Sequence, residues 1–480
     1  MCPSKHGRWA PLVAALTPLV VYLPLAVRRY GWSDDFSHLF WDGEVDRIAS
    51  DARPLKALVF HLVFSPADDI DVLMPLRVIG IAGIAVLAWS LARWLRDWGL
   101  GPWAGAFLGA STALLPTFQI YGGWATAFAF PWVTVACSWA LLTWTAAESK
   151  RAERARAFAV MAAGLSYYPP AAMFGWCLLA VRVVVTRTPL RRTCRQAISA
   201  GGLVLGSGAV AFAVARITIA GMGVDMADRV GLVSTPSEVV DKLIWFVTHP
   251  AVVAVRPFQI SSPGGLEATL TALPVLLLIA AGLWRTAPGR PVERAGWLGM
   301  IVVLVSTSFF VHLAVTDNQI EFRFMSGLTV AGWLLLVLAA LTVAPRPPSR
   351  VASPRVLAPV CAVILVFLGA VAASNVNDLF VRPTRITERY VAAALEEFDA
   401  DVHERIHVVN DRSWWPLKPD LGTFSTRTDL SHGWVEEPLI RLLLAERGFN
   451  ADRPTISVSP EPEPGPTILV VDLRPLIGRL

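Results

Sequence analysis

The run FMSGLTVAGWLLLVLAALTVA, from Phe324 to Ala344, contains no charged residue over 21 positions. A helix rises 1.5 Å per residue, so this run is long enough to cross the roughly 30 Å hydrocarbon core of a bilayer. Hydrophobic residues make up 54% of the 480 positions and charged residues only 16%, with a mean hydropathy of +0.53. Too few charges remain to cover a soluble protein of this length, so an all-α polytopic membrane protein is predicted.

Outward from this run, the same pattern predicts about 11 transmembrane segments. The first has no small-x-small cleavage site after it, and we interpret it as a retained span rather than a removed leader. The segments lie at roughly 9–27, 74–95, 103–120, 123–146, 157–167, 171–185, 197–219, 266–284, 296–316, 324–344 and 356–376.

Basic residues gather in alternate loops, which predicts the orientation of the chain. These loops are expected to face the cytoplasm together with the N-terminus, and eleven spans then put the C-terminal segment outside. The pair 157–167 and 171–185 is interpreted as two half-length elements meeting at an outward-facing break at Tyr168-Pro169-Pro170; the alternative is one long kinked span. The basic loops contain Arg93 and Arg96; Lys150, Arg151, Arg154 and Arg156; Arg187, Arg191, Arg192 and Arg195; Arg285, Arg290 and Arg294; and Arg346, Arg350 and Arg355.

Two domains are predicted: a transmembrane domain over 1–376 and an extracytoplasmic α/β domain over 377–480. The second domain shows a helical pattern at Glu388–Phe398 and strand patterns at Ile406–Val409 and Thr467–Asp472. It carries 17 acidic and 12 basic residues, so the net charge of +5 hides a basic membrane part. That basicity indicates cytoplasmic anchoring in a lipid bilayer and not binding to nucleic acid.

The first external segment contains the pair Asp34 and Asp35, with Ser33 as a plausible helix N-cap. The pair has two interpretations: capping of a surface helix, or a carboxylate that accepts a proton from a hydroxyl nucleophile or helps to hold a divalent cation. Asp51-Ala52-Arg53-Pro54-Leu55 follows. Arg53, together with Arg28 and Arg29, forms an external arginine cluster that would suit a phosphate-bearing lipid or make ordinary headgroup contacts.

Two further places combine polar groups with span ends. The short turn Thr316–Arg323 contains Glu321 and Arg323, and the arginine would either meet a phosphate or merely extend to the interface. Tyr167 and Tyr168 lie at a break in a span, where they would line a site or form a packing kink. The sequence contains no Walker loop, dinucleotide fingerprint, Gly-x-Ser-x-Gly or HExxH motif.

Taken together, these stretches resemble the GT-C superfamily of membrane glycosyltransferases, and most nearly its serotype-modifying O-antigen glucosyltransferases. That family tends to carry an Asp-Asp pair after its first span, as at Asp34-Asp35. An Asp-Gly-Arg-Pro-Leu stretch follows in the family; here it is residues 51–55, with Ala52 in place of glycine. A Leu-Ser-x-x-Tyr-Gln stretch resembles residues 165–169, where Pro169 departs from the pattern, and a Glu-x-Arg turn resembles residues 321–323.

The resemblance implies an enzyme of the bacterial plasma membrane that moves a sugar from a polyprenyl-phosphate donor to a cell-envelope glycan or lipid acceptor. Asp34 or Asp35 would be the general base, and Arg53 and Arg323 would bind the donor phosphate. Asp51, Tyr167, Tyr168 and Glu321 are expected to line the site. A divalent cation is an open alternative, because one Asp pair supplies too few oxygens for a complete metal site.

Two other functions compete with this one. A lipid-linked glycan flippase or transporter predicts charged residues buried along a pathway through the spans. A non-catalytic envelope scaffold would use the C-terminal domain for binding and leaves the acids of the first external segment without a task.

Overall fold

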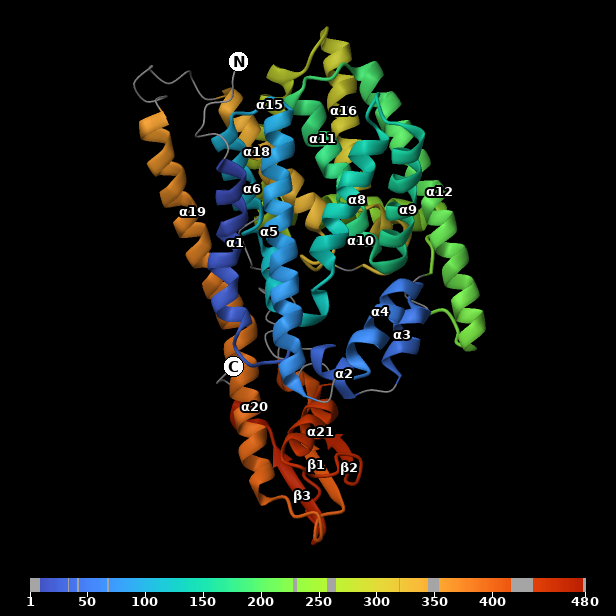
Figure 1. The fold of residues 1–480 in the computed structure, drawn as a ribbon, viewed down its shortest axis with the longest axis vertical. Helices are drawn as coiled ribbons and strands as arrows, with labels where there is room; N and C mark the ends of the chain where they lie inside the picture. Colours follow the sequence, from blue (N-terminus) through green and yellow to red (C-terminus); the bar gives the residue numbers. More distant parts are fainter. Residues whose placement is uncertain are drawn as a thin grey trace.

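The computed structural model describes residues 9–32, 34–40, 43–66, 69–227, 231–256, 265–318, 320–343, 354–415 and 435–477. The chain is mostly helical, with a small three-stranded sheet near its C-terminus, as the composition predicted (Figure 1). In the described part, six helices are long and apolar enough to cross a membrane. They cover Ile70–Asp97, Ala125–Trp144, Leu190–Met222, Ala268–Thr286, Ser326–Val343 and Pro359–Glu397.

All eleven apolar segments coincide with helices, several of them shorter than a full crossing. The helices are α1 (Ala10–Ala26), α5 (Leu73–Asp97), α6 (Pro102–Thr112), α8 (Phe130–Trp144), α9 (Arg151–Tyr167), α11 (Gly175–Val185), α12 (Leu190–Met222), α15 (Gly265–Thr286), α16 (Pro291–Thr307), α18 (Ser326–Val343) and α19 (Pro354–Val376).

Two expected segments are shorter than the apolar pattern suggested. The segment at 103–120 is divided into α6 and α7 (Pro116–Gly123), because Pro116 cannot donate the hydrogen bond that would continue α6. The segment at 296–316 ends with α16 at Thr307 and resumes as the short α17 (Phe310–Ala314). At that end the hydroxyl of Ser308 donates to the Val305 carbonyl, a local bond that competes with the helical pattern.

The chain turns back at Tyr168, as expected for two half-length elements. Tyr168 precedes a proline and is extended (φ −153°, ψ 90°), which ends α9; α10 (Pro169–Ala172) and α11 follow. A Cβ added to Gly164 would lie 3.5 Å from the Cβ of Ala172. Eight residues of continuous helix would separate these positions by about 12 Å, so the segment is not a single kinked span.

Three short helices and the C-terminal sheet lie at the end of the bundle opposite the start of α1 (Figure 1). The short helices are α2 (Asp34–Phe40), α3 (Glu44–Ser50) and α4 (Pro54–Phe64). Helix α19 continues through the π-helical segment Asn377–Val381 into α20 (Arg382–Ala394). The segment between α12 and α15 contains α13 (Pro236–Thr248) and α14 (Pro250–Ala254).

The sheet is parallel, with strand order β2-β1-β3, formed by β1 (Arg405–Val409), β2 (Thr455–Ser459) and β3 (Ile468–Asp472). Strands β1 and β3 were predicted. Strand β2 was not predicted, because it has only two apolar residues, of which Ile456 is partly buried and Val458 is exposed. Helix α21 (Glu436–Glu446) packs against α2 and so connects this domain to the segment between α1 and α5.

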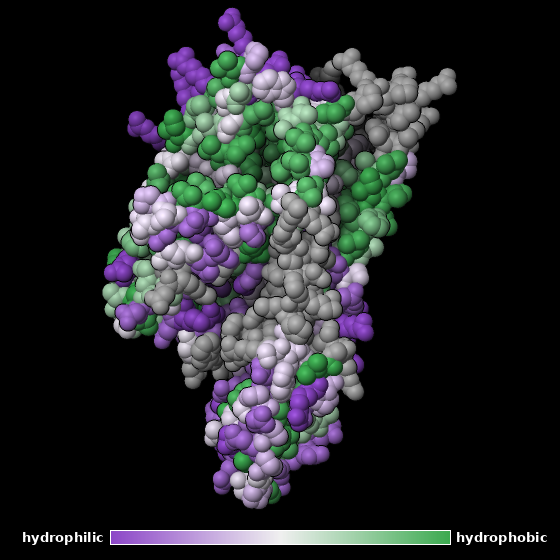
Figure 2. All heavy atoms as spheres, turned by 180° about the vertical axis from the view of Figure 1, so that it is seen from behind, coloured by the Kyte–Doolittle hydropathy of each residue, from purple (hydrophilic) through white to green (hydrophobic). Residues whose placement is uncertain are grey.

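Hydrophobic residues gather on the helical body of the face drawn in Figure 2, whereas its upper edge and the lower domain are more hydrophilic. Small residues bring the helices of this body together. A Cβ added to Gly282 of α15 would lie 2.4 Å from the Cβ of Ala339 in α18, so these helices touch along their backbones. Close contact of this kind is typical of helices packed in lipid, where hydrophobicity alone does not drive association.

We therefore expect Gly282→Ala to destabilise the protein by about 1–3 kcal/mol through overpacking. Gly202→Ala is the matched control, because no atom lies within 4 Å of a Cβ added there in α12. Thermal unfolding of both variants in nanodiscs tests this, and equal melting temperatures for the two would contradict the packing described.

Candidate active site

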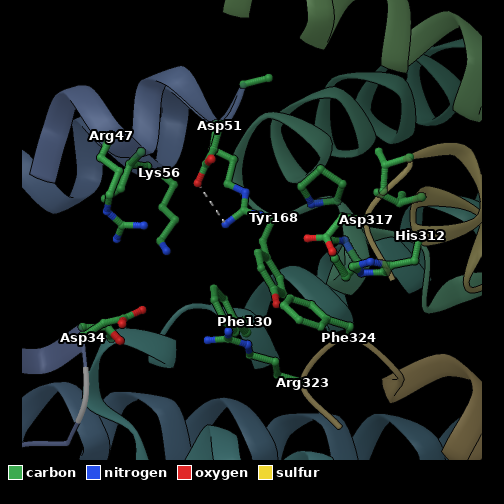
Figure 3. A pocket seen from close by; sticks show the side chains of 18 of the residues that line it. Asp34, Arg47, Asp51, Lys56, Phe130, Tyr168, His312, Asp317, Arg323 and Phe324 are labelled. Atoms are coloured by element: carbon green, nitrogen blue, oxygen red, sulfur yellow. Dashed lines mark ion pairs between the residues drawn. The ribbon is translucent and has the colours of Figure 1, made fainter. Parts of the chain in front are cut away.

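A cavity of about 220 Å³ lies between the α3–α4 pair and the end of the helical bundle (Figure 3). Its walls come from six separate parts of the chain. Its lining consists of Asp34, Arg47, Ile48, Asp51, Ala52, Arg53, Lys56, Trp124, Thr126, Phe130, Tyr168, Pro169, Pro170, Val311, His312, Val315, Asp317, Arg323 and Phe324.

The α3–α4 turn directs Asp51 and Arg53 into this cavity. Between them Ala52 has a left-handed backbone (φ 59°), a conformation that glycine adopts most easily. A residue with a side chain costs about 1–2 kcal/mol in this conformation. Arg53 Nη1 lies 3.9 Å from Asp51 Oδ2, and the Arg53 guanidinium lies 5.4 Å from the centre of the Tyr168 ring.

Arg323 approaches from the opposite wall and is fixed at several points. It pairs with Glu321, and its guanidinium lies 4.7 Å from the ring centre of Trp124. The hydroxyl of Tyr121 donates to the Arg323 carbonyl at 2.9 Å. Arg323 therefore presents a permanent positive charge held in place by aromatic and backbone contacts.

Lys56 adds a third cation that the sequence analysis missed. Its ammonium lies 4.6 Å from the ring centre of Phe60 and 5.7 Å from that of Phe130, and the residue is buried. Burial, followed by the charge of the Arg53 guanidinium, lowers the pKa of Lys56 to about 7, against the Asp34 carboxylate, which raises it. The low pKa therefore reflects mainly the burial of the amine, with a smaller contribution from the neighbouring arginines.

A fourth cation, Arg47, is held by a buried carboxylate behind the cavity wall. Its Nη2 donates to Glu44 Oε2 at 2.6 Å, and its Nε donates to both carboxylate oxygens at 3.0 and 2.9 Å. His38 Nδ1 lies 3.3 Å from the same Glu44 carboxylate. Burial lowers the pKa of His38 well below its ordinary value, so the imidazole is neutral and adds no charge.

The adjacent acids Asp34 and Asp35 have different surroundings. Asp34 faces the cavity (Figure 3). Burial raises its pKa, but the positive charges of Arg323 and Arg47 outweigh this and hold the pKa below its ordinary value. Asp34 is therefore an ionised carboxylate among cations.

Asp35 is fully buried and does not contribute to the cavity lining. Its two oxygens accept the backbone N–H groups of Trp32 at 3.0 Å and Thr126 at 2.9 Å. Burial raises its pKa to about 7, against the lowering by the Arg77 charge and these donors. Either acid was expected to be the base, but only Asp34 lines the cavity. Asp35 is a positioning residue. Its orientation could not be read from the sequence.

Tyr168 and Tyr167 also differ. The Tyr168 ring lines the cavity and stacks on Phe130 at 3.7 Å between ring centres. Tyr167 is buried behind this stack, 6.4 Å from Phe130, and lies outside the lining. The Tyr168 hydroxyl and Trp124 Nε1 are buried and form no hydrogen bond with any group that the structure describes. Both belong to residues of the cavity wall.

Of the predicted residues, the structure brings Asp34, Asp51, Arg53, Tyr168 and Arg323 together. Asp35 and Tyr167 lie behind the wall, and Glu321 supports Arg323 without lining the cavity. The expected arginine cluster is incomplete: Arg28 bonds Asn377, and Arg29 pairs with Asp71 and Glu446, toward the C-terminal domain. The expected N-cap, Ser33, lies outside the described residues.

The structure adds Arg47, Lys56, Trp124, His312 and Asp317 to the predicted set. The signal that could have revealed Lys56 is a single lysine inside the largely apolar run 54–64. Among the described residues, no group of three or more His, Cys, Asp or Glu side chains is arranged to hold a metal ion. No known family matches the sequence, and no curated protein matches it either.

Substitutions of the two acids are expected to change the stability of the protein by different amounts. Asp35→Asn replaces one buried acceptor with an N–H donor that faces a backbone N–H, so a loss of about 1–3 kcal/mol is expected. Asp34→Asn changes a cavity residue and should cost less. Thermal unfolding of the two variants side by side tests this, and a greater loss for Asp34→Asn would reverse the assignment.

The pKa of Lys56 leads us to expect that anion binding depends on pH. A bound anion stabilises the protonated amine and raises its pKa above 7. The affinity for a dialkyl phosphate, which has no ionisation near neutral pH, should be highest below pH 7 and fall by up to about tenfold per pH unit above it.

Lys56→Arg, which stays charged, should bind with no such fall, and Lys56→Met should bind weakly at every pH. Isothermal titration calorimetry across pH 6–9 measures this. A fall that persists in Lys56→Arg would assign the titration to another group, such as Asp35.

Proposed function

We propose that this protein is a membrane glycosyltransferase. It moves a sugar from a polyprenyl-phosphate donor to a cell-envelope glycan or lipid acceptor on the external face of the bacterial plasma membrane. One observation carries the proposal: an ionised carboxylate, Asp34, shares a cavity at one end of an apolar bundle with four basic side chains, Arg47, Arg53, Lys56 and Arg323.

The cations suit the phosphate of the donor. In the reaction the acceptor hydroxyl attacks the anomeric carbon while the bond between that carbon and the phosphate oxygen breaks. The leaving polyprenyl phosphate takes the electron pair, and fixed positive charge at Arg323 and Arg53 stabilises it. Attack from the opposite side inverts the anomeric centre.

Asp34 suits the role of general base, and takes the proton of the acceptor hydroxyl. In the free protein, Arg323 and Arg47 hold its pKa low. The negative phosphodiester of the donor offsets these charges and raises the pKa, so Asp34 becomes a better base when the donor is present. Asp35 holds the start of α2 in position by accepting two backbone N–H groups.

The proposal includes the topology: about 11 spans, a cytoplasmic N-terminus and an extracytoplasmic C-terminal domain. It is supported by the position of α2, α3, α4 and the sheet at the end of the bundle opposite the start of α1. A flippase or transporter is the alternative. The buried charge Arg77 in α5 does not favour it, because its guanidinium donates to the carbonyls of Ala26, Arg28 and Tyr30.

Purified protein in nanodiscs, supplied with a panel of polyprenyl-phosphate sugars and acceptor glycans, should release polyprenyl phosphate. Asp34→Asn is expected to lower this rate by about 10²–10⁴-fold. Asp46→Asn, which removes an exposed carboxylate of α3 outside the cavity, should retain the rate. A folded Asp34→Asn variant with full activity would exclude the mechanism. Transport of lipid-linked sugar across the membrane of proteoliposomes, with no glycosylated product formed, would favour the flippase.

A further inference from the structure

Helix α13, in the external segment between α12 and α15, has an apolar face that no part of the described chain covers. Its residues fall into three sectors when placed at 100° intervals around the axis. The exposed apolar sector spans about 140°. It consists of Val239, Val240, Leu243, Ile244 and Val247, which are between 47% and 63% exposed.

Of the other two sectors, one is polar and the other is packed against the protein. Ser237, Asp241 and Thr248 form a narrow polar sector that is open to solvent. Lys242, Trp245 and Phe246 face the protein. The helix begins with a capping box, in which Thr235 accepts the Glu238 N–H and Glu238 accepts the Thr235 N–H. A capped helix of 13 residues with this division is a stable element, too short to cross a bilayer.

The level of α13 relative to the bundle follows from its contacts. Lys242 Nζ donates to the Asp317 carbonyl and to Asn318 Oδ1, each at 2.6 Å. These residues lie just before the candidate span α18, which begins at Ser326. The helix also packs against α14 and α17, at the same end of the bundle. Helix α13 therefore lies at the depth where a span leaves the hydrocarbon.

We propose that α13 lies in the plane of the external leaflet, with its apolar sector buried among acyl chains just below the lipid headgroups. An apolar arc beside a polar one, on a helix held at headgroup depth, is the arrangement of interfacial helices. The occupant of this face is thus bilayer lipid. This inference requires that the bundle is embedded in a membrane, and the choice of the external leaflet rests on the proposed topology; it stands apart from the transfer chemistry.

The consequence for the cavity follows from the contacts of α13. Asp317, held through its carbonyl by Lys242, lines the cavity. Trp245 lies 6.0 Å from Phe309, whose ring stacks on that of His312, another lining residue, at 5.0 Å. Just before α13, Val233 N–H donates to the Ala314 carbonyl at 2.9 Å. Lipid contact at α13 therefore fixes one wall of the cavity at headgroup depth.

Spin labels test the depth directly. Four variants carry one label each, in a chain whose five native cysteines are replaced: Val240→Cys and Ile244→Cys in the apolar sector, and Ser237→Cys and Asp241→Cys in the polar sector. In nanodiscs the apolar pair should be relaxed mainly by oxygen, and the polar pair by a water-soluble nickel chelate. Positions 240 and 241 are neighbours, so each serves as the control for the other.

Equal exposure of all four labels to the nickel chelate would overturn the proposal. Shielding of positions 240 and 244 from both reagents, with dipolar broadening between labels, would place a second copy of the chain on this face and would also overturn it. As a second measurement, Leu243→Asp/Val247→Asp should raise hydrogen exchange at residues 231–233 and 314–316 several-fold in nanodiscs, relative to Asp241→Asn. Unchanged exchange would reject the coupling to the cavity wall.

Discussion

The buried carboxylate of Asp35 is the contact on which the site depends. It joins the Trp32 N–H, before α2, to the Thr126 N–H, before α8. Arg77 acts beside it by donating to three carbonyls at the end of α1. In surroundings that offer no water, unsatisfied backbone groups cost several kcal/mol each, so these contacts fix where α1 ends and α2 begins. Because neighbouring residues on a helix point about 100° apart, a fixed Asp35 directs Asp34 into the cavity.

The cavity then acquires an electrostatic character that no single residue has. Its basic side chains are kept apart by aromatic rings and paired acids: Trp124 beside Arg323, Phe60 beside Lys56, and Glu44 beneath Arg47. The pKa of Lys56 is depressed chiefly because the amine is buried, and the neighbouring arginines add to this effect. An anionic group beside the amine would stabilise its protonated form, whereas a neutral group would not.

Much of the fold could be predicted from the sequence, because uncharged runs of sufficient length have few alternatives to a helix. Arg323 was recognised by its charge at the start of a span, and residues 51–53 as an arginine beside an acid in a stretch that resembles a family motif. The separation of Asp34 from Asp35 was not predictable, since it depends on contacts with residues 126 and 77, far along the chain. Lys56 was missed because the segment between the first two predicted spans was treated as a loop and its α4 helix was not expected. Helix α13 was likewise not recognised between two predicted spans, because its apolar positions are spaced around a helix and form no continuous run.

The contacts that hold the linker between α1 and α2 have a consequence for the order of synthesis. Arg28 bonds Asn377, Gly31 bonds Glu388 and Arg29 pairs with Glu446, so these partners are 349, 357 and 417 residues apart. At about 5–20 residues per second, a ribosome needs roughly 20–80 s to make the second partner after the first. For most of translation the linker therefore lacks its three C-terminal partners, and it gains these contacts only when the last hundred residues have emerged and folded.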